Sequence, residues 1–112
     1  QRGMGTMLIS HDLGAIAEVA TQVMVLYAGR VVEHAPVDRL FAEAQHPYTI
    51  GLLSSLPKLG GREQRLSTIA GRVPLPGTVR TGCRFADRCP WALTRCRLEA
   101  PALTEIASGH RV

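Results

Sequence analysis

The sequence has 112 residues, of which 46% are hydrophobic and 4% aromatic, and its formal net charge is +4. This composition excludes a wholly disordered chain, and no apolar run approaches the roughly 20 residues that span a bilayer. The N-terminal residues lack the apolar core of a secretory signal, so we expect no signal peptide. The cysteine count is odd, at three, which favours a reducing compartment over a disulfide scaffold.

The charge is divided unevenly along the chain. Residues 1–56 carry three arginines and five acidic side chains, whereas residues 57–112 carry ten basic and four acidic side chains. The two halves are therefore predicted to face different surroundings. A basic second half suits nucleic acid, an anionic lipid surface or a thiolate cluster, and it equally suits a solvated arginine-rich surface.

The first half has the pattern of an α/β protein. Residues 6–10 form a short continuous apolar run, which predicts a buried parallel strand. Apolar side chains at helical spacing predict a helix over 13–20, with Asp12 suited to cap it. The apolar stretch 23–27 is a second strand candidate, and residues 30–34, after the Ala-Gly turn, predict its β-hairpin partner.

Two short helices are predicted after the hairpin. Pro36 suits the first turn of the first helix, because proline has no N–H to leave unpaired there. The second helix is predicted to run from Pro47 to about Ser55, with Pro57 ending it. The preceding His46 is most simply interpreted as part of that helix start.

The second half is predicted to be irregular. Residues 58–65 contain a Gly-Gly pair and have the composition of a surface linker, and 66–82 are rich in proline and glycine, which favours an extended loop. The cysteine segment, 82–96, and the stretch 101–112 have the same irregular character, with one short helix expected after Pro90. Small modules of this kind often depend on a metal or a disulfide for stability.

All three cysteines lie in this segment. Cys83, Cys89 and Cys96 have the spacing C-x5-C-x6-C, and arginines stand beside them at 84, 88, 95 and 97. Clustered thiolates in a cationic setting indicate a metal or iron–sulfur site, although such sites usually have four ligands. Zinc bound by the three cysteines and His110 is one alternative. Reduced, buried cysteines without a metal are the other.

His11 is the candidate functional residue of the first half. It directly follows the predicted strand, at the edge where open α/β sheets bind their ligands. An imidazole there is suited to hydrogen-bond a phosphate oxygen or to orient a water molecule. A surface or capping histidine with no function is the simpler alternative.

The whole chain resembles one protein family. Residues 7–13, the helix after them and the hairpin at 25–33 resemble the end of the ATPase domain of ABC transporters. The His-Pro-Tyr-Thr string at 46–49, the Ile-x-Gly-x-x-Pro string at 69–74 and the Gly-Cys-x-Phe-x-x-Arg-Cys-Pro string at 82–90 resemble the C-terminal extension of oligopeptide and dipeptide importer ATPase subunits. The order of these motifs makes the resemblance specific.

The resemblance implies an α/β fold in two parts, with 1–45 as the C-terminal end of the ATPase domain and 46–112 as the extension. It implies that His11 is the switch histidine, which contacts the γ-phosphate of ATP. The parent subunit would bind ATP and Mg²⁺ and energise import of peptides or related solutes across the bacterial inner membrane. The sequence shows no Gly-rich phosphate loop, so we expect no ATP hydrolysis by the chain alone.

The resemblance also implies a [4Fe–4S] cluster held by four cysteines, three of which match Cys83, Cys89 and Cys96. The family's fourth cysteine typically follows a His-x-Val stretch, here 110–112, so we expect the site to be empty in this chain. The neighbouring arginines would offset the cluster's negative charge.

The implied partners are a second ATPase subunit and the membrane permease, at the cytoplasmic face of the membrane. Self-association through unpaired strand edges is a further expectation. Two alternatives remain, a stand-alone metal- or iron–sulfur-binding module and a purely structural dimerisation tail. A nucleic-acid-binding module is disfavoured, because the cysteine segment lacks interleaved aromatic residues for base stacking.

Overall fold

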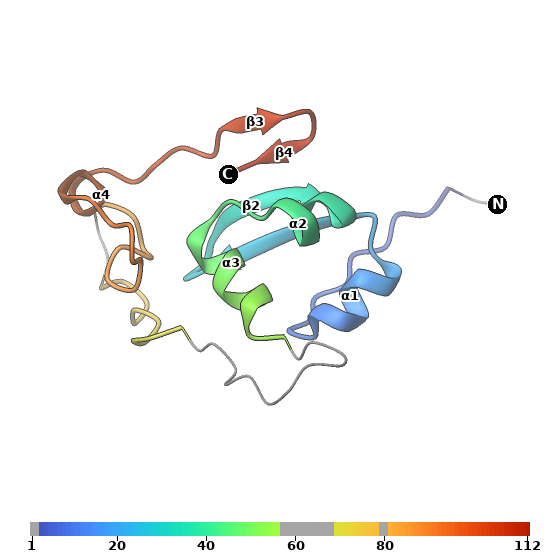
Figure 1. Cartoon of the computed structure of the whole chain (residues 1–112), viewed down its shortest axis with the longest axis horizontal. Helices are drawn as coiled ribbons and strands as arrows, with labels where there is room; N and C mark the ends of the chain where they lie inside the picture. The colour runs from blue at the N-terminus through green and yellow to red at the C-terminus, as the bar shows by residue number, and fades with distance from the viewer. Residues whose placement is uncertain (1–2, 57–68, 79–80) are drawn as a thin grey trace.

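The computed structural model describes residues 3–56, 69–78 and 81–112. Short helices flank a four-stranded antiparallel sheet with the order β1-β2-β4-β3 (Figure 1). In chain order, the elements are α1 (Leu13–Val19), β1 (Gln22–Tyr27), β2 (Arg30–Pro36), α2 (Val37–Glu43), α3 (Pro47–Ser54), α4 (Thr94–Leu98), β3 (Glu105–Ala107) and β4 (His110–Arg111). The predicted mixture of helices and strands is confirmed.

The first helix begins where Asp12 caps it. Its Oδ1 accepts a hydrogen bond from the N–H of Ala15 at 3.2 Å. This bond satisfies one of the backbone donors that the first helical turn leaves free. The hydroxyl oxygen of Ser10 accepts from the N–H of Asp12 at 3.0 Å. The predicted helix is confirmed, and Ala20 is its C-cap.

Strands β1 and β2 form the predicted hairpin. Side chains of β1 alternate between solvent and interior, and Val23, Val25 and Tyr27 are buried. This alternation is typical of a strand with one covered face. Ala28 and Gly29, at the turn, have φ values of 48° and 80°. Positive φ at both central residues is what a two-residue type I′ turn requires.

Helix α2 covers the inner face of the hairpin. Leu40 has no exposed surface and packs on a small apolar core. The other buried members of this core are Val23, Val25 and Ala35. Burial of an apolar side chain of this size contributes about 1.5–3 kcal/mol to stability. Partly buried Ile16 of α1 also contacts this core.

Helix α3 begins at the predicted place. His46 is the N-cap, and its Nδ1 accepts a hydrogen bond from the N–H of Tyr48 at 3.0 Å. Pro47 occupies the first helical position, where its missing N–H costs nothing. Ser55 is the C-cap. The interpretation of His46 as a helix start is therefore confirmed.

The C-terminal residues form a hairpin, so the prediction of an irregular stretch over 101–112 is wrong. Thr104 and Val112 exchange two backbone hydrogen bonds of 2.8 and 2.9 Å. Strand β4 then pairs with β2, where Arg111 lies opposite His34. In Figure 1 this hairpin lies beside β2 at the top of the sheet. Strands of two or three residues are too short to show the alternation by which a strand is predicted.

The cysteine segment consists mainly of turns, as predicted. Residues 82–92 contain no helix or strand, and the expected short helix after Pro90 is confirmed as α4. The Cys83 N–H donates to the Cys96 carbonyl oxygen at 2.6 Å. This bond brings the start of the segment against α4.

The predicted strand at residues 6–10 is not formed. The segment has no regular structure, and Met7 and Ile9 are 88% and 90% exposed. A strand needs a neighbour to pair its backbone groups, and none of the described residues supplies one here. His11 therefore follows an irregular, exposed segment and not a buried strand.

Part of the predicted linker region lies outside the described residues. This applies to 58–65 and to Pro57, whose helix-ending role is therefore untested. In the described part of the loop, 69–78, turns are present but no helix or strand. None of the described helices is long and apolar enough to cross a membrane.

Candidate functional site

His11 is exposed at the bend that leads into α1. Hydrogen bonds hold the residues on both sides of His11. The side chain of Asp12 accepts from the N–H of Ala15, and the hydroxyl oxygen of Ser10 accepts from the N–H of Asp12. Among the described residues, none hydrogen-bonds to the His11 ring. The structure thus presents an imidazole on an ordered turn, open to solvent.

The cysteine segment docks on the turn of the β1–β2 hairpin through Phe85. This ring is 2% exposed and lies at right angles to the ring of Tyr27, with centroids 5.0 Å apart. The rings of Tyr48 and His46 lie 5.6 and 5.7 Å away. The edge-to-face contact of Phe85 with Tyr27 adds about 0.5–1.5 kcal/mol to the effect of burial. The Phe85 docking site therefore joins β1, α3 and the cysteine segment.

Arg88 also stabilises the Phe85 docking site. Its Nε and one terminal nitrogen donate to the carbonyl oxygens of Ala70 and Ile69 at 2.9 and 3.2 Å, and the other terminal nitrogen donates to the Tyr27 hydroxyl at 3.2 Å. The guanidinium carbon lies 5.8 Å from the centroid of the Tyr27 ring and 5.9 Å from that of Phe85. One side chain therefore connects the loop at 69–70, the hairpin and the aromatic cluster.

The other arginines beside the cysteines also bind protein groups. Arg84 donates to the carbonyl oxygen of Ala28, in the hairpin turn. The remaining pairs are Arg95 with Glu99, and Arg97 with Asp87. The family resemblance implied that these cations offset the charge of a metal cluster. In the structure, Arg84 and Arg88 fasten the segment to the hairpin.

A buried polar network links the first half to the C-terminal strand. Glu33 of β2 is fully buried, and its Oε2 lies 2.6 Å from Nε2 of His110, which is 1% exposed. The carboxylate also accepts from the N–H groups of Gln45 and His46, each at 2.9 Å. Burial is the larger influence on His46 and lowers its pKa, while the negative charge of Glu33 opposes that shift. A buried carboxylate is stable only with such a full set of donors.

The three cysteines are half-buried free thiols. The backbone bond described above joins Cys83 to Cys96, and the Cys96 sulfur accepts a hydrogen bond from the N–H of Leu93 at 3.4 Å. Within the described residues, no three His, Cys, Asp or Glu side chains are grouped so as to hold a metal ion. His110 lies against Glu33 and not with the cysteines.

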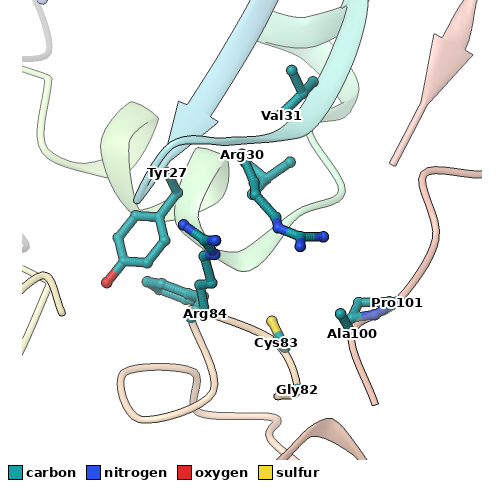
Figure 2. A pocket seen from close by; sticks show the side chains of 10 residues that line it. Tyr27, Arg30, Val31, Gly82, Cys83, Arg84, Ala100 and Pro101 are labelled. Atoms are coloured by element: carbon teal, nitrogen blue, oxygen red, sulfur yellow. The ribbon is translucent and has the colours of Figure 1, made fainter. Parts of the chain in front are cut away.

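A small pocket lies between the hairpin turn and the cysteine segment (Figure 2). Its volume is about 50 Å³, which holds a few water-sized molecules and is far below the size of a nucleotide or peptide site. Figure 2 shows the sulfur of Cys83 pointing toward the space between Arg84 and Pro101, with Arg30 above it. The described pocket is thus suited only to very small molecules.

Residues 32–96 match the family described as the oligopeptide/dipeptide transporter, C-terminal region. The match covers more than half of the chain, from β2 through the Phe85 docking site to the last cysteine. The chain belongs to this family. Membership of the oligopeptide/dipeptide transporter family confirms the resemblance found in the sequence.

The names of similar proteins agree with this family membership. The chain is 49% identical over 106 residues to the oligopeptide transport ATP-binding protein AppD of Bacillus subtilis. The aligned region covers 95% of the chain and 32% of AppD. It is 42% identical over 116 residues to a putative peptide import ATP-binding protein of Brucella ovis, covering 98% of the chain and 34% of that relative. A probable peptide ABC transporter ATP-binding protein of Sinorhizobium fredii is 49% identical over 109 residues. The chain spans about a third of the length of such family members.

Sequence reasoning did not find the pairing of Glu33 with His110. The partners are 77 positions apart, and neither lies in a local pattern that predicts burial. The sequence analysis interpreted Glu33 as part of a hairpin strand. It interpreted His110 as a possible zinc ligand and as part of the His-x-Val stretch. The docking roles of Arg84 and Arg88 were missed for the same reason, since their partners lie in other segments.

Proposed function

We propose that this chain is part of an ATP-hydrolysing subunit that energises the import of peptides or related solutes across the bacterial inner membrane. The observation that carries the proposal is the family match over 32–96, together with relatives named as peptide import ATP-binding proteins along nearly the whole chain. The subunit would bind ATP with Mg²⁺ and work at the cytoplasmic face with a second ATPase subunit and a membrane permease.

In this proposal, the chain has two parts. Residues 1–45 complete the ATPase domain, and 46–112 form an extension that regulates the subunit or contacts a partner. Support comes from the buried contacts between the parts, namely Phe85 on Tyr27 and His110 on Glu33. These contacts would keep the extension in a fixed position beside the hairpin. Unpaired strand edges would also allow two copies to associate, which light scattering of the purified chain tests.

We assign the γ-phosphate contact to His11. The support is its exposed imidazole on a turn that Asp12 holds in place. A side chain that stabilises charge only in the transition state changes kcat more than KM. His11→Ala in the intact protein, assembled with its transport partners, should therefore lower kcat for ATP about a hundredfold or more.

The matched control is His34→Ala, which removes an imidazole from β2, where His34 lies opposite Met24 and Arg111 in the sheet. It should leave kcat nearly unchanged. Because His11 is exposed, His11→Ala should not lower the melting temperature. Unchanged ATP turnover in the His11→Ala protein would show that the assignment is wrong.

A second candidate function concerns the cysteines. The observation that favours it is the backbone bond between Cys83 and Cys96, which holds two of the three thiols in one small region. Together with Cys89, they would supply three thiolate ligands to an iron–sulfur cluster in the intact protein, whose chemistry is electron storage or structural support. The described side chains do not form a three-ligand set for a single metal ion, so zinc is the weaker alternative.

Metal analysis after anaerobic purification tests this second candidate. Brown protein with broad absorbance near roughly 400 nm and bound iron supports a cluster. Colourless protein with one zinc per chain supports the alternative. Metal-free protein with three free thiols contradicts both.

A further inference from the structure

A side-chain hydrogen bond spans the backbone of His11. The hydroxyl oxygen of Ser10 accepts from the N–H of Asp12 at 3.0 Å. The ring that this bond closes contains the φ and ψ angles of His11, because it runs from the Ser10 side chain through the His11 backbone to the Asp12 nitrogen. Those two angles set the direction in which the imidazole leaves the chain. Ser10 thus restrains the residue that follows it.

Asp12 connects the same turn to α1. Its Oδ1 accepts from the N–H of Ala15 at 3.2 Å, and its backbone carbonyl oxygen accepts from the N–H of Ile16 at 3.2 Å. Gly14 lies beside these bonds, and a Cβ there would stand 3.3 Å from the Asp12 Oδ1. A glycine at this position leaves room for the carboxylate. Asp12 is therefore held on one side by Ser10 and on the other by the first turn of α1.

The residues before Ser10 give His11 no support of this kind. Residues 3–10 form no helix or strand, and all of them are exposed. Helix α1 has no buried residue, although partly buried Ile16 contacts the core. In the described part of the chain, the restraint on the His11 turn therefore comes mainly from the hydrogen bonds of Ser10 and Asp12.

We propose that Ser10 and Asp12 are positioning residues for His11. The inference rests on the proposed function, which assigns the γ-phosphate contact to His11. Neither side chain needs to touch the nucleotide, because each fixes the backbone from which the imidazole extends. A group that is oriented before the substrate binds loses no further freedom in the transition state. Freeing the backbone of one residue should lower kcat about five- to thirtyfold, the factor that corresponds to its conformational entropy.

Two variants of Asp12 test the proposal in the intact protein, assembled with its transport partners. Asp12→Ala removes the cap and should lower kcat for ATP about five- to thirtyfold with KM little changed. Asp12→Asn keeps a capping acceptor and should retain kcat within about twofold. The pair separates hydrogen bonding from charge, because asparagine is neutral. A kcat in Asp12→Asn as low as that in Asp12→Ala would overturn the proposal.

Ser10 is tested in the same way. Ser10→Ala removes the acceptor of the Asp12 N–H and should lower kcat, whereas Ser10→Thr keeps the hydroxyl and should retain it. Glu18→Ala is the matched control, because it removes an exposed carboxylate from α1 without changing the cap. It should leave kcat and KM unchanged. A loss in Glu18→Ala as large as in Asp12→Ala would contradict the role given to the cap.

Double variants show whether the two side chains act through His11. In the His11→Ala background, Asp12→Ala and Ser10→Ala should cause no further loss of kcat, because no imidazole is left to orient. The same fold-loss in both backgrounds would overturn the proposal. Unchanged kcat in His11→Ala contradicts the γ-phosphate contact and this inference with it. A loss in His11→Ala without a loss in Asp12→Ala contradicts the positioning role alone.

Hydrogen exchange gives a readout that does not depend on catalysis. In the nucleotide-free protein, the backbone amides of Asp12, Ala15 and Ile16 should exchange faster in Asp12→Ala than in the wild type, because the turn opens more often. Asp12→Asn should exchange as the wild type does. Mass spectrometry of a peptide that covers 10–16 measures the difference. Equal exchange in all three proteins would show that the cap does not restrain the turn, and would also overturn the proposal.

Discussion

His110 and Glu33 meet in the interior, with Nε2 and Oε2 2.6 Å apart, although 77 positions separate them in the chain. The same carboxylate accepts from the backbone of Gln45 and His46. One side chain of β2 thus holds both the start of α3 and strand β4. Burial of a carboxylate costs several kcal/mol unless donors surround it, and here three donors do so.

The first prediction follows from this network. Glu33→Gln replaces an oxygen by an NH₂ group, so one of the buried donors loses its acceptor and meets another donor. We expect the free energy of unfolding to fall by about 3 kcal/mol, measured by urea denaturation. Glu43→Gln is the control, since Glu43 is exposed and pairs loosely with Arg39 at 3.8 Å. It should cost less than about 0.5 kcal/mol. Equal losses for the two variants would contradict the role given to Glu33.

The second prediction concerns pH and His46. Burial lowers the pKa of His46, with Glu33 opposing, and the neutral ring accepts the capping bond from Tyr48. The unfolded chain therefore binds a proton more readily than the folded chain, so the free energy of unfolding should fall as the pH drops below about 6.5.

His46→Asn isolates this effect, because asparagine keeps a capping acceptor but does not titrate. Melting temperatures measured from about pH 8 to about pH 5 should fall less steeply for His46→Asn than for the wild type. Identical slopes would mean that His46 does not contribute to the pH dependence.

The third prediction tests the Phe85 docking site. Phe85→Ala removes a buried ring between Tyr27 and Tyr48, and the loss of burial and the cavity together should cost about 3 kcal/mol. Trypsin should cut the cysteine segment much faster in this variant, because the undocked state is more populated. Leu98→Ala is the control, since Leu98 is 70% exposed at the end of α4, directly after that segment. A cleavage rate in Phe85→Ala no faster than in Leu98→Ala would rule out docking through this ring.

The fourth prediction separates backbone strain from a steric clash. Gly82 and Gly77 both have positive φ, 76° and 80°. A Cβ at Gly77 meets nothing within 4 Å, whereas one at Gly82 meets the backbone of Arg97 and Cys96 at 2.5–2.6 Å. Gly77→Ala should cost about 1–2 kcal/mol. Gly82→Ala should cost clearly more, and thermal denaturation of both variants measures the difference. Equal costs would argue against the close approach of Cys83 to Cys96.

Local chemistry made some elements predictable. The cap by Asp12, the hairpin around Ala28 and the start of α3 at Pro47 depend on residues next to one another, so their pattern is visible in the sequence. The motif strings likewise consist of neighbouring residues, and they indicated the family. The strand predicted at 6–10 failed because pairing with a neighbour, and not the apolar run alone, makes a strand.

The sequence by itself determined the helices and hairpin of the first half, the irregular cysteine segment with its short helix, and the family. Only the tertiary structure decided which distant groups meet. It put His110 on Glu33, Phe85 between two tyrosines, and Cys83 against Cys96. The physical reason is that such contacts depend on burial and on the complete pairing of polar groups across the fold, and sequence spacing carries neither.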